Sequence, residues 1–148
     1  MSFSAWSADG LLREQFTQLG EVRLLLAAVD RDPADASVAG LSADRKFTTA
    51  YEAVLGLATM LLRTRNLRAS GDGSHWVTLQ AIPLVLGQDE RQRTRYFDAC
   101  RIKRHVATYE RAGGISQTEA DELLLEARMF RTTVLTFLRD NFAALSPE

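Results

Sequence analysis

Lys and Arg residues gather in one segment of the chain, and this segment carries the residue types best suited to binding an anion. Residues 91–111 include seven Lys or Arg and only two acidic residues, whereas residues 1–66 have seven basic and eight acidic ones. An arginine guanidinium donates paired hydrogen bonds to phosphate oxygens, and a histidine exchanges a proton near neutral pH. Because the formal net charge is only −1, the sequence predicts a local phosphate site and excludes a generally polycationic protein.

When residues 96–110 are wound as a helix at about 100° per residue, they separate into a basic side and an apolar side. Arg101, Arg104 and His105 fall on the basic side, which we expect to face solvent. Phe97 lies on this side too, where its ring would stack on a nucleic-acid base or pack against a partner subunit. The opposite side, which we expect to be buried, has small and aliphatic residues: Ala99, Ile102, Val106 and Ala107.

The spacing of the basic side alone leaves two interpretations open. In the first, the two arginines, His105 and Phe97 bind RNA or nucleotide phosphates. In the second, the side is an ordinary solvated helix face on which Asp98 and Arg101 form a local ion pair. Spacing alone favours the solvated face, so the choice depends on the residues around it.

A longer pattern surrounds the basic side. It is Phe97-x-x-x-Arg101-x-x-Arg104-His105-x-x-x-Tyr109-Glu110, followed by Gly113-Gly114-Ile115-Ser116 and a segment rich in Ala and Leu. Over residues 42–140 this pattern resembles the HEPN superfamily. The likeness is to a variant of small bacterial members in which Arg-x-x-Arg-Asn-x-x-x-Tyr precedes a glycine turn and a helix. The resemblance implies a HEPN-like helical domain over residues 1–148, with a helix and a loop in residues 1–40.

The resemblance also implies a site. In active members, an Arg, a small polar residue and a later His cleave RNA, and a second subunit completes the site. Arg104, His105 and Tyr109 match these catalytic positions, and a second match uses Arg101 and His105. Tyrosine, with a reference pKa near 10, is a poor general base. RNA or nucleotide binding through Arg101, Arg104, His105 and Phe97 is therefore favoured, with a metal-independent endoribonuclease and a non-enzymatic interaction module as alternatives.

The expected partners and setting follow from the resemblance and from composition. The resemblance implies a homodimer and a cognate nucleotidyltransferase or antitoxin, within a toxin–antitoxin or defence module. No cofactor and no metal are expected, since His75 and His105 lack ligand spacing such as His-Glu-x-x-His. The single Cys100, expected to be a buried inert thiol, favours a reducing cytoplasmic setting. The longest nearly apolar run, residues 53–62, is short of the roughly 20 residues of a membrane span, so no membrane contact is expected.

The elements that must position these residues are predicted to be helices. Helical periodicity predicts long helices over residues 9–29, from Ser42 to a flexible loop at 68–73, over 89–112 and over 116–142. A short helix is predicted over 75–86, and no segment has the alternation typical of a strand. A chain of 148 residues with 46% hydrophobic residues suits one domain. We therefore expect an all-α, up-and-down bundle of four long helices plus one short helix.

Local signals mark two of the helix starts and raise one question. Ser42 is a good N-cap residue, and Ser116 and Glu119 have the spacing of a capping box. His75 and Trp76 follow a glycine-rich loop. They either close over a ligand near the arginines or anchor the start of a helix by packing, and packing is favoured for the tryptophan.

Overall fold

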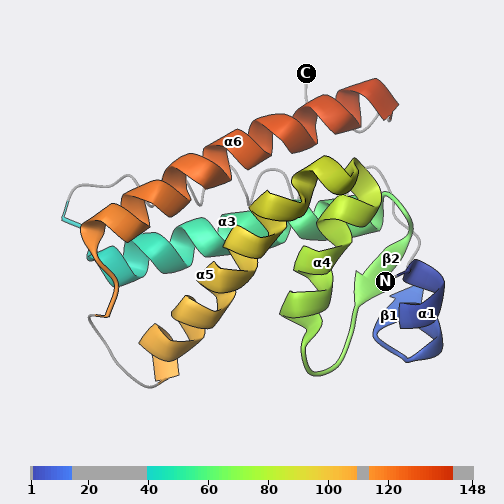
Figure 1. Ribbon diagram of the computed structural model, residues 1–148, viewed down its shortest axis with the longest axis horizontal. Coiled ribbons are helices and arrows are strands. Elements are labelled where there is room, and N and C mark those ends of the chain that lie inside the picture. Colours follow the sequence, from blue (N-terminus) through green and yellow to red (C-terminus); the bar gives the residue numbers. More distant parts are fainter. Residues whose placement is uncertain (1, 15–39, 110–113, 142–148) are drawn as a thin grey trace.

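The computed structural model describes residues 2–14, 40–109 and 114–141, which are mostly helical (Figure 1). The predicted all-α helical bundle is confirmed. The helices are α1 (Phe3–Ala8), α3 (Ala43–Arg63), α4 (Ser74–Leu86), α5 (Arg91–Tyr109) and α6 (Gln117–Asn141), with a 3₁₀ turn η1 (Gln88–Glu90) before α5. Two short strands, β1 (Leu12–Glu14) and β2 (Leu67–Ala69), pair antiparallel.

Helix α3 lies at the centre of the bundle and contacts α4, α5 and α6. Lys46 in the first turn of α3 pairs with Asp121 in α6 at 2.6 Å, and the two helices run in the same direction, whereas α4 and α5 run in opposite directions (Figure 1). Tyr51, Phe97 and Phe130 are among the largest fully buried side chains of the core. Within the described residues, no helix combines the length and the apolar character that crossing a membrane requires.

Two predicted caps fix where the two central helices begin. The Ser42 hydroxyl accepts a hydrogen bond from the Arg45 amide at 3.2 Å, immediately before α3. At the start of α6, the Ser116 amide donates to the Glu119 carboxylate and the Glu119 amide donates to the Ser116 hydroxyl, both at 3.1 Å. These bonds satisfy amides that have no partner inside a helix. The predicted capping box is therefore confirmed, and it marks the start of α6.

The N-terminal segment departs from the prediction. Residues 12–14, placed in a helix over 9–29, form strand β1 instead, and residues 15–29 lie outside the described residues. The expected flexible loop at 68–73 supplies part of β2, with Leu12 opposite Ala69. Three-residue strands are too short to show alternation, so contact between distant segments overrides the local pattern. The ribbon helps to bury a second apolar cluster of Trp6, Leu12, Leu62, Val77 and Ala81.

Candidate functional site

Helix α5 is rotated relative to the sequence prediction, so that its aromatic residue faces the core. Phe97, expected on the exposed basic side, is completely buried and its ring lies 5.1 Å from the ring of Phe130 in α6. The expectation that Phe97 stacks on a base or packs against another subunit is therefore wrong for this chain. Its ring is part of the contact between α5 and α6.

The side of α5 that was expected to be buried lies at the surface. Ile102 is 52% exposed, Val106 is 40% exposed, and Ala99 is exposed as well, while the side chain of Ala107 lies outside the described residues. Two physical effects favour this rotation. One phenyl ring buries more apolar area than these smaller side chains, and arginine stems can lie along an apolar surface while their charged heads stay near water.

The same rotation carries two of the predicted arginines toward α3 and α4. The guanidinium carbon of Arg104 lies 5.5 Å from the ring centroid of Tyr51, which is a cation–π distance. Its Nη2 atom is 3.7 Å from Oε1 of Glu52, so this ion pair is longer than a hydrogen bond. One turn earlier in α5, Arg101 donates from Nε to Oδ1 of Asp98 at 2.7 Å, as the solvated-face interpretation anticipates.

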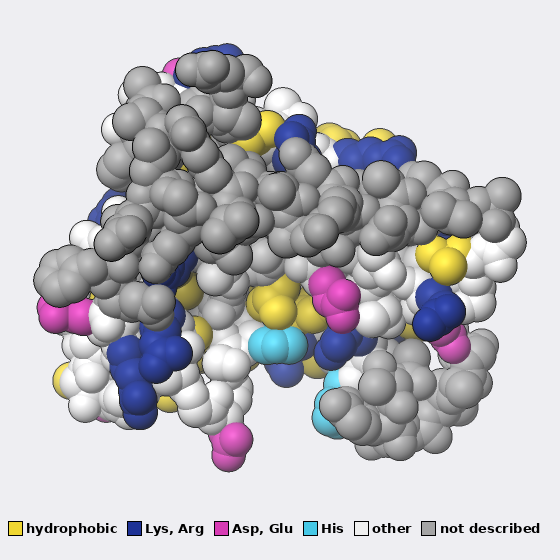
Figure 2. Space-filling view, turned by 180° about the vertical axis from the view of Figure 1, so that it is seen from behind, with side chains coloured by type: hydrophobic (Ala, Val, Ile, Leu, Met, Phe, Trp, Pro, Cys, Tyr) yellow, Lys and Arg dark blue, Asp and Glu magenta, His cyan; other side chains and the backbone are white. Residues whose placement is uncertain are grey.

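A histidine from a third helix completes the group. Gly73, with φ +77°, adopts a left-handed conformation that suits glycine and begins α4, which places His75 in the first turn. Nδ1 of His75 lies 3.4 Å from the Tyr51 hydroxyl, while the residue remains exposed to solvent. We call Tyr51, Glu52, His75, Arg101 and Arg104 the arginine–histidine cluster. Figure 2 shows histidine side chains beside basic and acidic ones near the middle of one face.

The protonation states of the cluster follow from burial and from the two arginine charges. Partial burial lowers the pKa of His75 below its usual value, and the charges of Arg104 and Arg101 lower it further. Burial raises the pKa of Tyr51 to about 12, against the opposing effect of Arg104. At neutral pH, the cluster therefore presents a neutral imidazole that can accept a proton and a phenol that keeps its own.

Arg104 has more donors than the structure uses. Its side chain is 23% exposed, and its Nε atom is buried with no acceptor among the described residues. A guanidinium has five N–H donors in a fixed plane, so the long contact with Glu52 leaves most of that capacity open. Buried donors without partners are rare in folded proteins, and each calls for an explanation such as a ligand that supplies the missing acceptor.

The remaining predicted site residues have different positions. His105 is exposed beyond Arg104, and the side chain of Tyr109 lies outside the described residues. Cys100 is buried as expected, and burial raises the pKa of its thiol to about 11. Trp76 packs against the second apolar cluster, with its ring 6.2 Å from that of Trp6, so the packing interpretation is confirmed for the tryptophan.

Sequence reasoning missed Tyr51 and Glu52, two of the five residues of the arginine–histidine cluster. No motif or spacing in the sequence indicates that either residue belongs to a site. His75 had one signal, its position after a glycine-rich loop. No group of three or more His, Cys, Asp or Glu side chains that could hold a metal ion occurs in the part of the chain that the structure describes.

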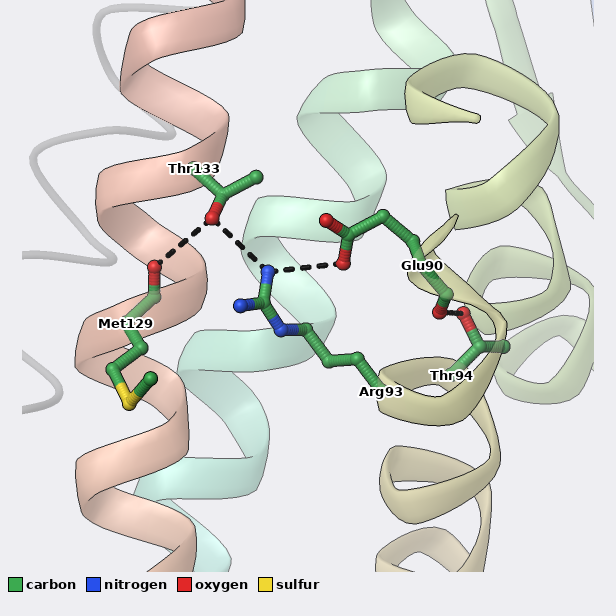
Figure 3. A network of polar contacts seen from close by, with 5 residues as sticks. All are labelled: Glu90, Arg93, Thr94, Met129 and Thr133. Atoms are coloured by element: carbon green, nitrogen blue, oxygen red, sulfur yellow. Dashed lines mark hydrogen bonds and ion pairs between the residues drawn. The ribbon is translucent and has the colours of Figure 1, made fainter. Parts of the chain in front are cut away.

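A different arginine of α5 has two close polar contacts. Nη1 of Arg93 contacts Oε2 of Glu90 and the hydroxyl of Thr133, both at 3.0 Å, as Figure 3 shows. The Thr133 hydroxyl in turn donates to the carbonyl of Met129, and the Thr94 hydroxyl donates to that of Glu90. This network connects the first turn of α5 to the middle of α6.

Comparison with protein-family models, with curated proteins and with solved structures finds no match to this chain. The function is therefore inferred from the residues and their geometry. The arginine–histidine cluster is the candidate site because it combines two cations, a neutral base and a buried donor without a partner.

Proposed function

We propose that the protein binds RNA or nucleotide phosphates at the arginine–histidine cluster. The observation that carries this proposal is the guanidinium of Arg104, which is partly exposed and whose ion pair with Glu52 is a long one, 3.7 Å, among the residues that the structure describes. A phosphate oxygen is a suitable acceptor, because guanidinium and phosphate form short, charge-assisted hydrogen bonds. Arg101 supplies a second positive charge near the same surface.

The contacts around Arg104 are compatible with ligand exchange. The Glu52 side chain is 51% exposed and its carboxylate lies 3.7 Å away, so a phosphate would displace only a weak contact. The Tyr51 ring below the guanidinium holds its plane in place. The site is thus oriented before any ligand arrives, which lowers the entropic cost of binding.

Binding of a fluorescently labelled oligoribonucleotide, followed by anisotropy over a salt series, tests this proposal. Arg104→Gln is expected to weaken binding about tenfold. The slope of log affinity against log salt should fall by about 0.7 for the lost phosphate contact. Arg45→Gln removes one charge from an exposed position in the first turn of α3 and serves as the matched control. Equal affinities for the Arg104 and Arg45 variants would overturn the proposal.

RNA cleavage is a second candidate function, favoured by one observation. His75, neutral at pH 7 and exposed, faces the two arginines, so its imidazole can accept the proton of a ribose 2′-hydroxyl while the guanidiniums neutralise the attacked phosphate. If the protein cleaves RNA, His75→Ala should abolish turnover, whereas His105→Ala should not. The opposite result would return the catalytic role to His105.

A HEPN-like homodimer, as part of a toxin–antitoxin, defence or nucleotidyltransferase-linked module, is the assembly that we propose for this function. Its support is the exposed apolar character of Ile102, Val106, Leu125 and Met129 on α5 and α6. Such residues are common at subunit contacts. Sedimentation equilibrium measures the mass directly, and Ile102→Glu combined with Met129→Glu should shift a dimer to the monomer.

A further inference from the structure

A cavity lies away from the arginine–histidine cluster, where the last turns of α4 meet η1 and the first turns of α5. Its volume is about 290 Å³. Gln80, Pro83 and Leu84 line it from α4, Gln88 from η1, and Arg91 and Arg95 from α5. Because an engineered apolar cavity of about 150 Å³ holds benzene, this volume admits an aromatic ring together with a small polar group.

The two arginines of this cavity differ from the other cations of α5. Arg93, Arg101, Lys103 and Arg104 each form an ion pair with a carboxylate. In contrast, the side chains of Arg91 and Arg95 make no hydrogen bond or ion pair with any residue that the structure describes. One helical turn separates them, so their side chains project from the same side of α5. The cations without partners on this helix therefore line one and the same cavity.

The rest of the lining matches an anion that carries an apolar part. Gln80 and Gln88 add amide groups to the lining, and each amide can donate two hydrogen bonds. Pro83 and Leu84 supply an apolar surface. The acidic residues of η1 do not compete, since neither lines the cavity and Glu90 pairs with Arg93.

We propose that this cavity is a separate binding site for a phosphate group attached to a small apolar or aromatic moiety. The guanidiniums of Arg91 and Arg95 bind the phosphate oxygens from one side. The glutamine amides donate to the same group or to its neighbour, and Pro83 and Leu84 cover the attached moiety. This site does not depend on the proposed function of the arginine–histidine cluster.

Titration calorimetry with phenyl phosphate tests this site. We compare the full chain with Arg91→Gln/Arg95→Gln and with Arg13→Gln/Arg45→Gln, a control that removes two charges from other exposed positions. Circular dichroism verifies that each variant is folded. The Arg91/Arg95 variant should bind at least about tenfold more weakly than the control variant, because two charge-assisted contacts are lost. Inorganic phosphate should bind more weakly than phenyl phosphate, because it leaves the apolar wall uncovered.

Arg104→Gln separates this inference from the proposed function. The cavity should still bind phenyl phosphate in the Arg104 variant, whatever that variant does to RNA binding. Equal affinity in the Arg91/Arg95 variant and its control, or no saturable binding of phenyl phosphate, would overturn the inference. A labelled oligoribonucleotide then identifies the source of the phosphate. Weaker RNA binding by the Arg91/Arg95 variant would assign the phosphate in this cavity to a nucleic-acid strand. Unchanged RNA binding would assign it to a free metabolite. Both results are consistent with the proposed site.

Discussion

Arg93 and Arg104 lie near opposite ends of α5 and both place a guanidinium over an aromatic ring, but their polar contacts differ. Arg93 lies 5.7 Å from the ring of Phe130 and has a carboxylate and a hydroxyl at 3.0 Å. Arg104 lies 5.5 Å from the ring of Tyr51, reaches its carboxylate at 3.7 Å, and has a buried Nε without an acceptor. The fold gives Arg93 two close polar contacts, whereas it gives Arg104 only one long ion pair.

This difference separates a structural role from a binding role. The polar contacts of Arg93 come from η1 and α6, so they hold these elements together. The surroundings of Arg104 come from α3 and α4, and its acidic partner is half exposed to water. A helix can therefore carry arginines of both kinds, and the count of basic residues does not distinguish them. Their hydrogen-bond partners do.

The largest effect on stability is expected at Phe97, in the half of α5 that includes Arg93. Phe97→Ala should lower the free energy of unfolding by about 3–5 kcal/mol, because it opens a cavity against Phe130. Urea unfolding followed by circular dichroism measures this loss. Phe97→Leu is the control and should cost less than the alanine variant, since it retains most of the apolar volume. A loss below about 1 kcal/mol for the alanine variant would contradict the buried position of this ring.

A smaller loss of stability is expected when Arg93 is replaced. Arg93→Ala should lower the free energy of unfolding by about 2 kcal/mol, because it removes an ion pair and a bond to Thr133 and uncovers the Phe130 ring. Urea unfolding measures this value at fixed pH and salt. Affinity for RNA should stay within about twofold, once unfolded protein is accounted for. A stable Arg93 variant that loses RNA binding would reverse the roles assigned to the two ends of the helix.

Arg104 should contribute less to stability than Arg93 does. Arg104→Gln should change the free energy of unfolding by less than about 1 kcal/mol, because its ion pair is long and its carboxylate is half exposed. The same urea measurement, made beside the Arg93 variant, gives a direct comparison. A loss equal to that of Arg93→Ala would mean that Arg104 supports the fold and is not reserved for a ligand.

The smallest effect concerns pH. Because the folded state lowers the pKa of His75, the unfolded chain binds more protons at this position below about pH 6.5. Stability should therefore fall as the pH drops from about 6.5 toward the lower folded-state pKa, and His75→Gln should remove this part of the decrease. Unfolding in urea at pH 7.5, 6.5 and 5.5 measures the two slopes. Identical slopes for wild type and variant would show that neither burial nor the nearby arginines lowers the pKa of His75.

Much of the fold could be predicted because its signals are local. The hydroxyl of Ser42 and the reciprocal Ser116 and Glu119 pair mark helix starts that depend on a few neighbouring residues. The rotation of α5 could not be predicted in this way. Its apolar residues are few, and its buried face is decided by Phe130 of α6 and Tyr51 of α3, which the segment itself does not contain.

For the same reason, the arginines of the candidate site could be predicted from the sequence, but their neighbours from other helices could not. Arg101 and Arg104 belong to a basic run that is visible in the sequence, but the polar and aromatic neighbours of Arg104 come from another helix. The pair Tyr51 and Glu52 lies far from them along the chain, and no spacing rule connects the two segments. His75 lies near enough to Arg104 and Arg101 for their charges to lower its pKa, and it comes from the start of α4, a helix that runs in the opposite direction to α5.

The ribbon of β1 and β2 has a consequence for how the chain acquires its structure during translation. Strand β1 leaves the ribosome before α3 exists, whereas its partner β2 follows α3. Until α3 and α4 have also been made, Trp6 and Leu12 lack the other buried members of their apolar cluster, Leu62, Val77 and Ala81. A strand made before α3 is thus paired only after α3, and a newly made chain must keep these apolar side chains from aggregating until then.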